Sequence, residues 1–71
     1  MDNTELARDT QDIRRHIADL ESTTQTIKDL LDRDTPLEGK AVELEKLTED
    51  CVYHSEVIEE IAIRWRIALQ V

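Results

Sequence analysis

The sequence has few of the residues that build turns and thick cores. Among its 71 residues there are one glycine, one proline and no phenylalanine. Leu, Ile, Ala, Glu, Asp and Arg are abundant instead, a composition that favours long helices over strands and turns. A chain of this length forms one small domain and buries only about 60% of its unfolded surface. We therefore expect a thin core whose stability is marginal unless the chain associates.

Basic residues are also scarce. Nine Lys and Arg stand against 17 Asp and Glu, a formal net charge of −8. Binding to nucleic acid requires a basic surface, and so does docking on anionic lipid, so the composition predicts neither partner. The acidic residues are spread over both halves of the chain, which favours a solvated helical surface over a face that mimics nucleic acid.

A single cysteine, Cys51, excludes an internal disulfide. Small secreted domains usually carry several disulfides, so a reducing compartment fits better. The first residues show neither the basic nor the apolar region of a signal peptide, and no apolar run approaches the roughly 20 residues that span a bilayer. We expect a cytoplasmic protein.

The stretch from Asp34 to Glu38 predicts that one helix ends and another begins. Thr35 suits the N-cap and Pro36 the first helical position, and Glu38 completes a capping box with Thr35. The expected architecture is all-α: a helix over about 3–33, a turn over about 34–36 and a helix over about 36–70. Gly39 lies in the first turn of the second helix and weakens that end.

Apolar residues in the first half recur with a period of 3.5, the pattern of a coiled-coil contact. The seam residues of the first helix are Leu6, Ile13, Leu20 and Ile27, with Thr10, Ile17, Thr24 and Leu31 at the alternate positions. The segment 22–26 has poor helix propensity, but we expect the helix to continue through it.

The second half carries a matching seam, consisting of Leu44, Cys51, Ile58 and Trp65, with Leu47, His54, Ile61 and Ala68 interleaved. Pairs such as Ile13 with Ile58 and Leu20 with Cys51 have residue numbers that sum to 71. A chain folded back near residue 35 brings such pairs to the same height. The sequence therefore predicts an antiparallel two-helix hairpin, completed by a partner or by dimerisation.

The second helix has more apolar residues than one facing helix can cover. Val52, Ile63 and Ile67 fall on a second stripe, and the chain is apolar nearly all round from Ile61 to Val71. Such a surface usually contacts a protein partner, although scattered exposed aliphatic residues are also normal. The expected partner-binding residues are Val57, Ile63, Trp65, Ile67, Leu69 and Val71.

No group of residues predicts catalysis or a cofactor. Cys51 and His54 lie three residues apart, but a zinc site takes about four ligands and the sequence has no second cysteine. His16 stands one residue off the seam. The acidic residues of the second half lack the loop of a calcium site, and two helices offer no pocket for a substrate. We expect no catalytic, cofactor-binding or metal-binding residue, and therefore no enzyme.

The run from Ser55 to Trp65 resembles the aliphatic-rich segment near the C-terminus of the small YscE/SsaE/EscE-type co-chaperones of type III secretion. That resemblance implies a cytoplasmic helper that pairs with a helical-repeat chaperone, and the pair holds the needle subunit soluble and unpolymerised. It also implies that the chaperone covers the apolar surface of the second helix. Relatives use a looser, Gly-rich loop before that helix, and this chain departs from them there.

Two other functions fit the same sequence. A homodimeric four-helix bundle would act as a regulator or an antitoxin-like binding module, and the isolated chain could form such a homo-oligomer. An acidic mimic would inhibit a nucleic-acid enzyme and bind a basic partner in a salt-sensitive way.

Overall fold

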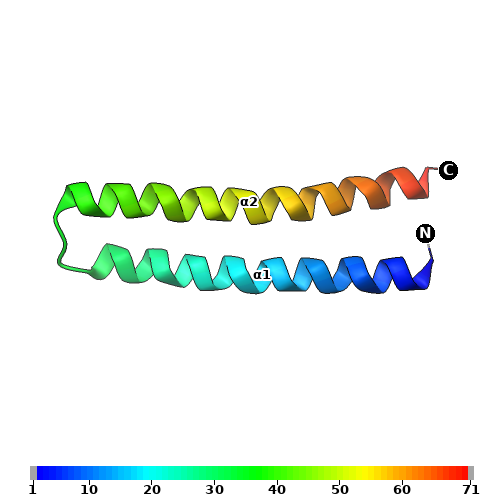
Figure 1. The fold of residues 1–71 in the computed structure, drawn as a ribbon, viewed down its shortest axis with the longest axis horizontal. Helices are drawn as coiled ribbons and strands as arrows, with labels where there is room; N and C mark the ends of the chain where they lie inside the picture. Colours follow the sequence, from blue (N-terminus) through cyan, green and yellow to red (C-terminus); the bar gives the residue numbers. More distant parts are fainter. Residues whose placement is uncertain (1, 71) are drawn as a thin grey trace.

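A computed structural model describes residues 2–70 as two antiparallel helices joined by a short connection (Figure 1). Helix α1 spans Asn3–Asp32 and helix α2 spans Leu37–Leu69. The molecule is a rod of 53 × 17 × 11 Å, with both ends of the chain at the same end of the rod. The predicted all-α hairpin is confirmed.

Helix α1 begins with a side-chain cap. The Glu5 backbone N–H donates to Asp2 Oδ1 at 2.7 Å, which satisfies one of the free donors of the first turn. The segment of poor helix propensity remains helical, as expected. There the Thr26 hydroxyl donates to the Ser22 carbonyl at 3.1 Å, a bond compatible with an unbroken helix.

The connection differs from the predicted capping box. Helix α2 begins at Leu37, one residue later than expected, and Pro36 is its N-cap with no side-chain hydrogen bond. The prediction that Thr35 and Glu38 cap this helix is therefore wrong. Pro36 has an extended ψ of 144°, and its carbonyl accepts the first intrahelical bond from Lys40 N at 3.1 Å. Proline at this position leaves no side-chain oxygen to receive the free N–H groups of the first turn.

Side chains of α2 bond to the end of α1 and to the connection itself. Lys40 Nζ donates to the Leu31 carbonyl at 3.3 Å, near the C-terminus of α1, where a cation is favourable. Arg33 and Glu43 form an ion pair at 3.3 Å. Gly39 is helical and does not have a positive φ, so the first turn of α2 is formed.

The seam of α2 lies where the sequence places it, whereas one row of the α1 seam is displaced. Ile13, Leu20 and Ile27 are half-buried between the helices, while Leu6 is more exposed. Most of the alternate row is wrong: Ile17 is 42% and Leu31 59% exposed, and Thr24 is exposed, whereas Thr10 is half-buried. The row that faces α2 stands one position earlier and consists of buried Asp9, Thr23 and Leu30 with half-buried His16.

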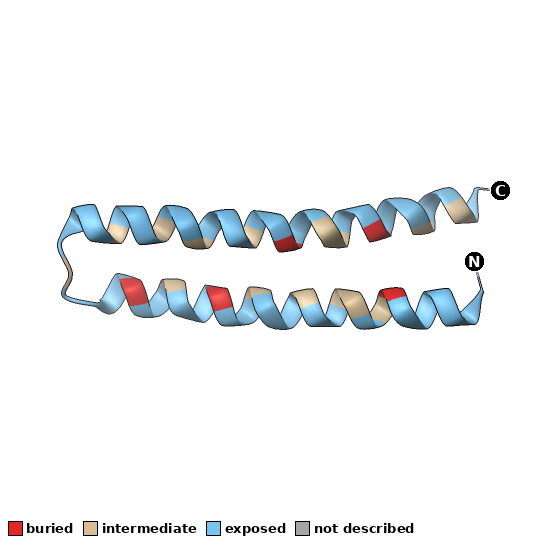
Figure 2. Cartoon of the chain, viewed as in Figure 1, coloured by how far each residue is buried: buried red, intermediate tan, exposed pale blue. Residues whose placement is uncertain are grey.

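The seam of α2 comprises buried His54 and Ile61 with half-buried Leu44, Leu47, Cys51, Ile58, Trp65 and Ala68. Leu30, with no exposed surface, and Ile61, at 4%, are the buried hydrophobic residues of the described chain. Figure 2 shows that buried positions are few and spread along the rod. Asp9, Thr23 and His54 are also buried. Three of the five buried residues are therefore polar, and polar contacts stand between the helices where a hydrophobic core would usually lie.

The rod exposes more surface than a compact protein of its size. Its accessible surface is 5641 Å², whereas a folded monomer of 8.3 kDa usually exposes about 4,600 Å². Its radius of gyration is 16.3 Å, against about 11 Å for a compact domain of this length. The difference in area, about 1,000 Å², is somewhat more than the roughly 800 Å² that one partner buries in a standard protein interface.

Neither of the two helices, over the residues described, is long and apolar enough to cross a membrane.

Candidate functional site

Two histidines meet across the hairpin at mid-length. His16 lies on α1 and His54 on α2, and their Nδ1 atoms are 2.7 Å apart. The ring centroids are 4.9 Å apart and the planes are inclined by 50°. One Nδ1 must donate and the other accept, because two ring nitrogens at this distance cannot both be lone-pair acceptors. The sequence placed His16 beside the seam, whereas the structure places it within the seam.

Carboxylates from both helices surround the buried ring. Nε2 of His54 is 3.6 Å from Asp50 Oδ2 on its own helix and 3.9 Å from Asp19 Oδ2 on the facing helix. Asp50 Oδ2 also accepts a 3.0 Å hydrogen bond from the Thr23 hydroxyl, which joins the two helices one turn further along. The cluster formed by His16, Asp19, Asp50 and His54 is named the histidine–carboxylate cluster below.

Tyr53 and Cys51 flank this cluster on α2. The Tyr53 ring meets the His54 ring edge-on at a centroid distance of 5.1 Å and the His16 ring at 6.1 Å. Such edge-on geometries are the favourable arrangement for aromatic rings. Cys51 is a half-buried free thiol.

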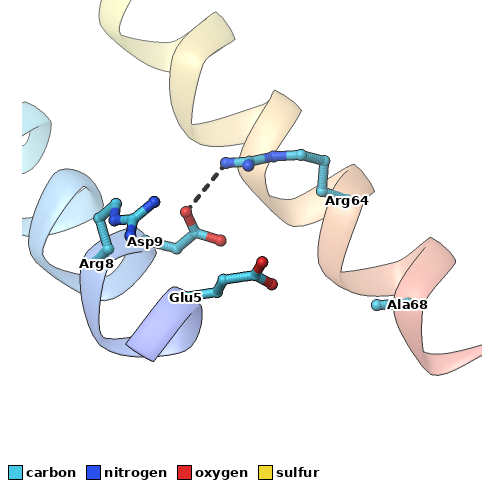
Figure 3. Close-up of a pocket in the computed structure, with 5 residues that line it drawn as sticks. All are labelled: Glu5, Arg8, Asp9, Arg64 and Ala68. Atoms are coloured by element: carbon cyan, nitrogen blue, oxygen red, sulfur yellow. Dashed lines mark hydrogen bonds and ion pairs between the residues drawn. The ribbon is translucent and has the colours of Figure 1, made fainter. Parts of the chain in front are cut away.

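A second polar group lies near the open end of the hairpin. Asp9 is 7% exposed, and its two oxygens are used by different residues of α2. The guanidinium of Arg64 donates to Oδ1 at 3.1 Å, and the indole N–H of Trp65 donates to Oδ2 at 2.9 Å. Figure 3 shows the Asp9 carboxylate directed at Arg64 across a hollow that Glu5, Arg8 and Ala68 also line. Both partners are supplied by the facing helix, so the buried charge is compensated.

An apolar hollow of about 310 Å³ lies beside this group. It is lined by Leu6 of α1 and by Trp65, Ala68 and Leu69 of α2. Trp65 is half-buried and its ring forms part of the wall. The hydrogen bond from its N–H to Asp9 holds the ring in this position. The hollow could accept one large apolar side chain.

The residues expected to bind a partner divide into three groups. Ile63, Ile67 and Leu69 are exposed, by 37%, 54% and 87%. Val57 and Trp65 are half-buried. Val71 lies outside the described residues. The exposed large aliphatic residues of the second stripe, Val52, Ile63 and Ile67, lie on α2, together with Leu69 at its end.

Sequence reasoning missed the polar contacts between the helices. It assigned no role to Asp9, Asp19, Thr23 or Asp50, and it left His16 outside the seam. A positional signal was available. Asp9, His16, Thr23 and Leu30 recur every seven residues, and each stands three positions after a residue of the predicted apolar row: Leu6, Ile13, Leu20 and Ile27. Three of these four residues are polar, so a search for apolar periodicity passes over them.

Comparison with known proteins gives no relative for this chain: no family model, curated protein or solved structure matches it.

Proposed function

We propose that this chain is a non-enzymatic, cytoplasmic protein-binding helper whose helix α2 is covered by a larger helical partner. The main observation that supports this proposal is that Ile63, Ile67 and Leu69 are exposed at the end of a hairpin with few buried hydrophobic residues. An amphipathic helix that lays such residues into an apolar groove is a common mode of recognition. The excess surface of about 1,000 Å² is enough for a stable interface.

The proposed partner is a helical-repeat chaperone, and the proposed cargo is the needle subunit of a type III secretion system. The identity of both follows from the resemblance of the segment from Ser55 to Trp65. The apolar hollow at Leu6 and Trp65 supports a partner on this end, because it offers a place for an anchoring side chain. Exposed Arg64 lines the neighbouring polar hollow, and arginine is enriched in protein interfaces.

The decisive experiment is co-expression with a helical-repeat protein and a needle subunit encoded beside this chain, followed by size-exclusion chromatography with light scattering. We expect a complex that contains this chain and keeps the needle subunit soluble. The double substitution Ile63→Asp with Ile67→Asp should abolish the complex, while the helical circular-dichroism signal persists. The matched control is Ile17→Asp with Leu31→Asp, which places the same charges at exposed aliphatic positions of α1.

Other results would contradict the proposal. A tight monomer with a high unfolding midpoint that binds neither protein would exclude a helper role. A stable dimer that ignores both proteins would favour the homodimeric four-helix bundle instead. Loss of helicity in the Ile63 and Ile67 double variant would mean that these residues belong to the core.

A further inference from the structure

We propose that the hairpin binds one divalent transition-metal ion of the zinc class at the histidine–carboxylate cluster. His16, Asp19 and His54 supply three ligands. The fourth would be Asp50, whose Oδ2 lies 3.6 Å from His54 Nε2 and would give up its hydrogen bond from Thr23. This inference is independent of the proposed function, because it concerns the middle of the seam and not the exposed end of α2.

The positions of the ligands support the assignment. One potential ligand atom each from His16, Asp19 and His54 lies within 4.8 Å of the other two. Each helix contributes a histidine and a carboxylate one turn apart: His16 and Asp19 on α1, Asp50 and His54 on α2. Facing helices commonly build metal sites from side chains projecting inward at such spacings.

The donor atoms select the class of ion. Imidazole nitrogen with carboxylate oxygen suits zinc and its transition-metal neighbours, whereas calcium and magnesium take sets made of oxygen. The electrostatics also favour a cation. Nε2 of His54 faces two carboxylates at 3.6 and 3.9 Å, and a dication beside this nitrogen would compensate both.

Small adjustments would convert the cluster into a coordination sphere. Metal–ligand distances of about 2.0–2.2 Å place tetrahedral ligand atoms about 3.3–3.5 Å apart. An ion beside Nε2 of His54 leaves Nδ1 of that ring on the far side, so the His16 ring must break its 2.7 Å Nδ1–Nδ1 contact and rotate to turn a nitrogen toward the ion. The ligand atoms of His16, Asp19 and His54 lie within 4.8 Å of one another, so no pair among them must shorten by more than about 1.5 Å. The Asp19 and Asp50 side chains are more than half exposed, so they are free to change rotamer.

The same exposure provides a route for the ion. His54 is 8% exposed, but the two carboxylates and the half-exposed His16 stand between it and solvent. An ion captured first by the carboxylates could reach His54 without opening the helices. Once bound, it would join α1 to α2 where their contact is polar, and it would restrain the hairpin against separation.

The test is titration of the full chain with zinc chloride at pH 7.5, by isothermal calorimetry and by thermal melts followed by circular dichroism. We expect one ion per chain and a midpoint that rises with zinc concentration, because an ion bound by the folded state stabilises it. His16→Gln should remove binding, and Asp19→Asn should weaken it about tenfold or more. At pH 5 binding should be much weaker, since imidazole binds metal only when deprotonated.

Two controls separate this site from other sources of zinc affinity. Asp29→Asn removes the same charge from α1 at a distance from the cluster and should leave affinity unchanged. Cys51→Ser should also have no effect, because the thiol is not among the proposed ligands. His54→Gln is a further ligand variant. If it fails to fold, the His16 and Asp19 variants, which alter more exposed residues, still decide the question.

The proposal is overturned by any of three results: no saturable binding at zinc concentrations up to about a hundredfold excess over protein, binding that persists in His16→Gln, or binding that is lost in Cys51→Ser. Cobalt(II) provides an independent readout. Its visible absorption should show nitrogen and oxygen ligands and no thiolate charge-transfer band in the wild-type chain.

Discussion

The indole N–H of Trp65 donates to the buried carboxylate of Asp9 across the two helices, at 2.9 Å. The other oxygen of Asp9 accepts from Arg64, so one acidic side chain holds two neighbouring residues of α2. This contact spans 56 positions of the sequence and secures the open end of the hairpin. It also fixes the Trp65 ring that lines the apolar hollow.

Asp9→Asn should lower the free energy of unfolding by about 1.5–3 kcal/mol, the usual value of a hydrogen bond to a charged group. Arg64 and Trp65 donate to different oxygens of Asp9, and an amide replaces one of these oxygens by an NH₂ donor. Urea denaturation followed by Trp65 fluorescence measures the change. Asp12→Asn is the matched control: Asp12 pairs with Arg15 on the exposed surface of α1, and its loss should change stability by less than about 0.5 kcal/mol. Equal effects of the two substitutions would argue against the buried contact.

Leu30 and Leu31 test which row of α1 faces α2. Leu30 has no exposed surface, whereas Leu31 is 59% exposed. Leu30→Ala should therefore cost about 2–5 kcal/mol of unfolding free energy, or unfold the chain. Leu31→Ala should change it by less than about 0.5 kcal/mol, as surface substitutions usually do. Thermal melts of the two variants give the comparison, and the reverse order would restore the seam expected from apolar periodicity.

Gly39→Ala should stabilise the protein by about 0.5–1 kcal/mol, because alanine has the higher helix propensity and restricts the unfolded chain. The position is helical and exposed, and an added Cβ would lie 3.4 Å from Thr35 Cγ2, an ordinary contact. Urea denaturation of this variant beside the wild type measures the gain. A loss of stability would mean that the first turn of α2 is not helical in solution.

Removing the polar side chain before each helix should lower the free energy of unfolding more at α1 than at α2. Asp2→Ala removes the hydrogen bond to Glu5 N and should cost about 0.5–2 kcal/mol. Thr35→Ala removes no cap of α2 and should have a smaller effect, below about 0.5 kcal/mol. Denaturation curves of both variants, with matched circular-dichroism amplitudes, distinguish them. A large cost at Thr35 would indicate that the capping box forms in solution.

Much of the architecture could be predicted because it depends on local patterns. Pro36 opposes a continuous helix, and the apolar residues of α2 repeat every seven positions. The position of the α2 seam, including Ile61, follows from that repeat. Helix α2 begins at Leu37, so the predicted boundary was displaced by one residue, a common uncertainty at helix ends.

The two helices, their antiparallel arrangement and one apolar row on each helix, the rows that begin at Leu6 and at Leu44, could be predicted from the sequence. Tertiary structure alone decided which alternate row of α1 turns inward. A period of 3.5 fits the row of Ile17 and Leu31 as well as the row of His16 and Leu30, and hydrophobicity favours the former. The structure selects the latter because His16, Thr23 and Asp9 meet polar partners on α2 that lie 38, 27 and 55 or 56 positions away in the sequence. Such complementarity exists only once the two helices face each other, and it creates both the histidine–carboxylate cluster and the Asp9 contact.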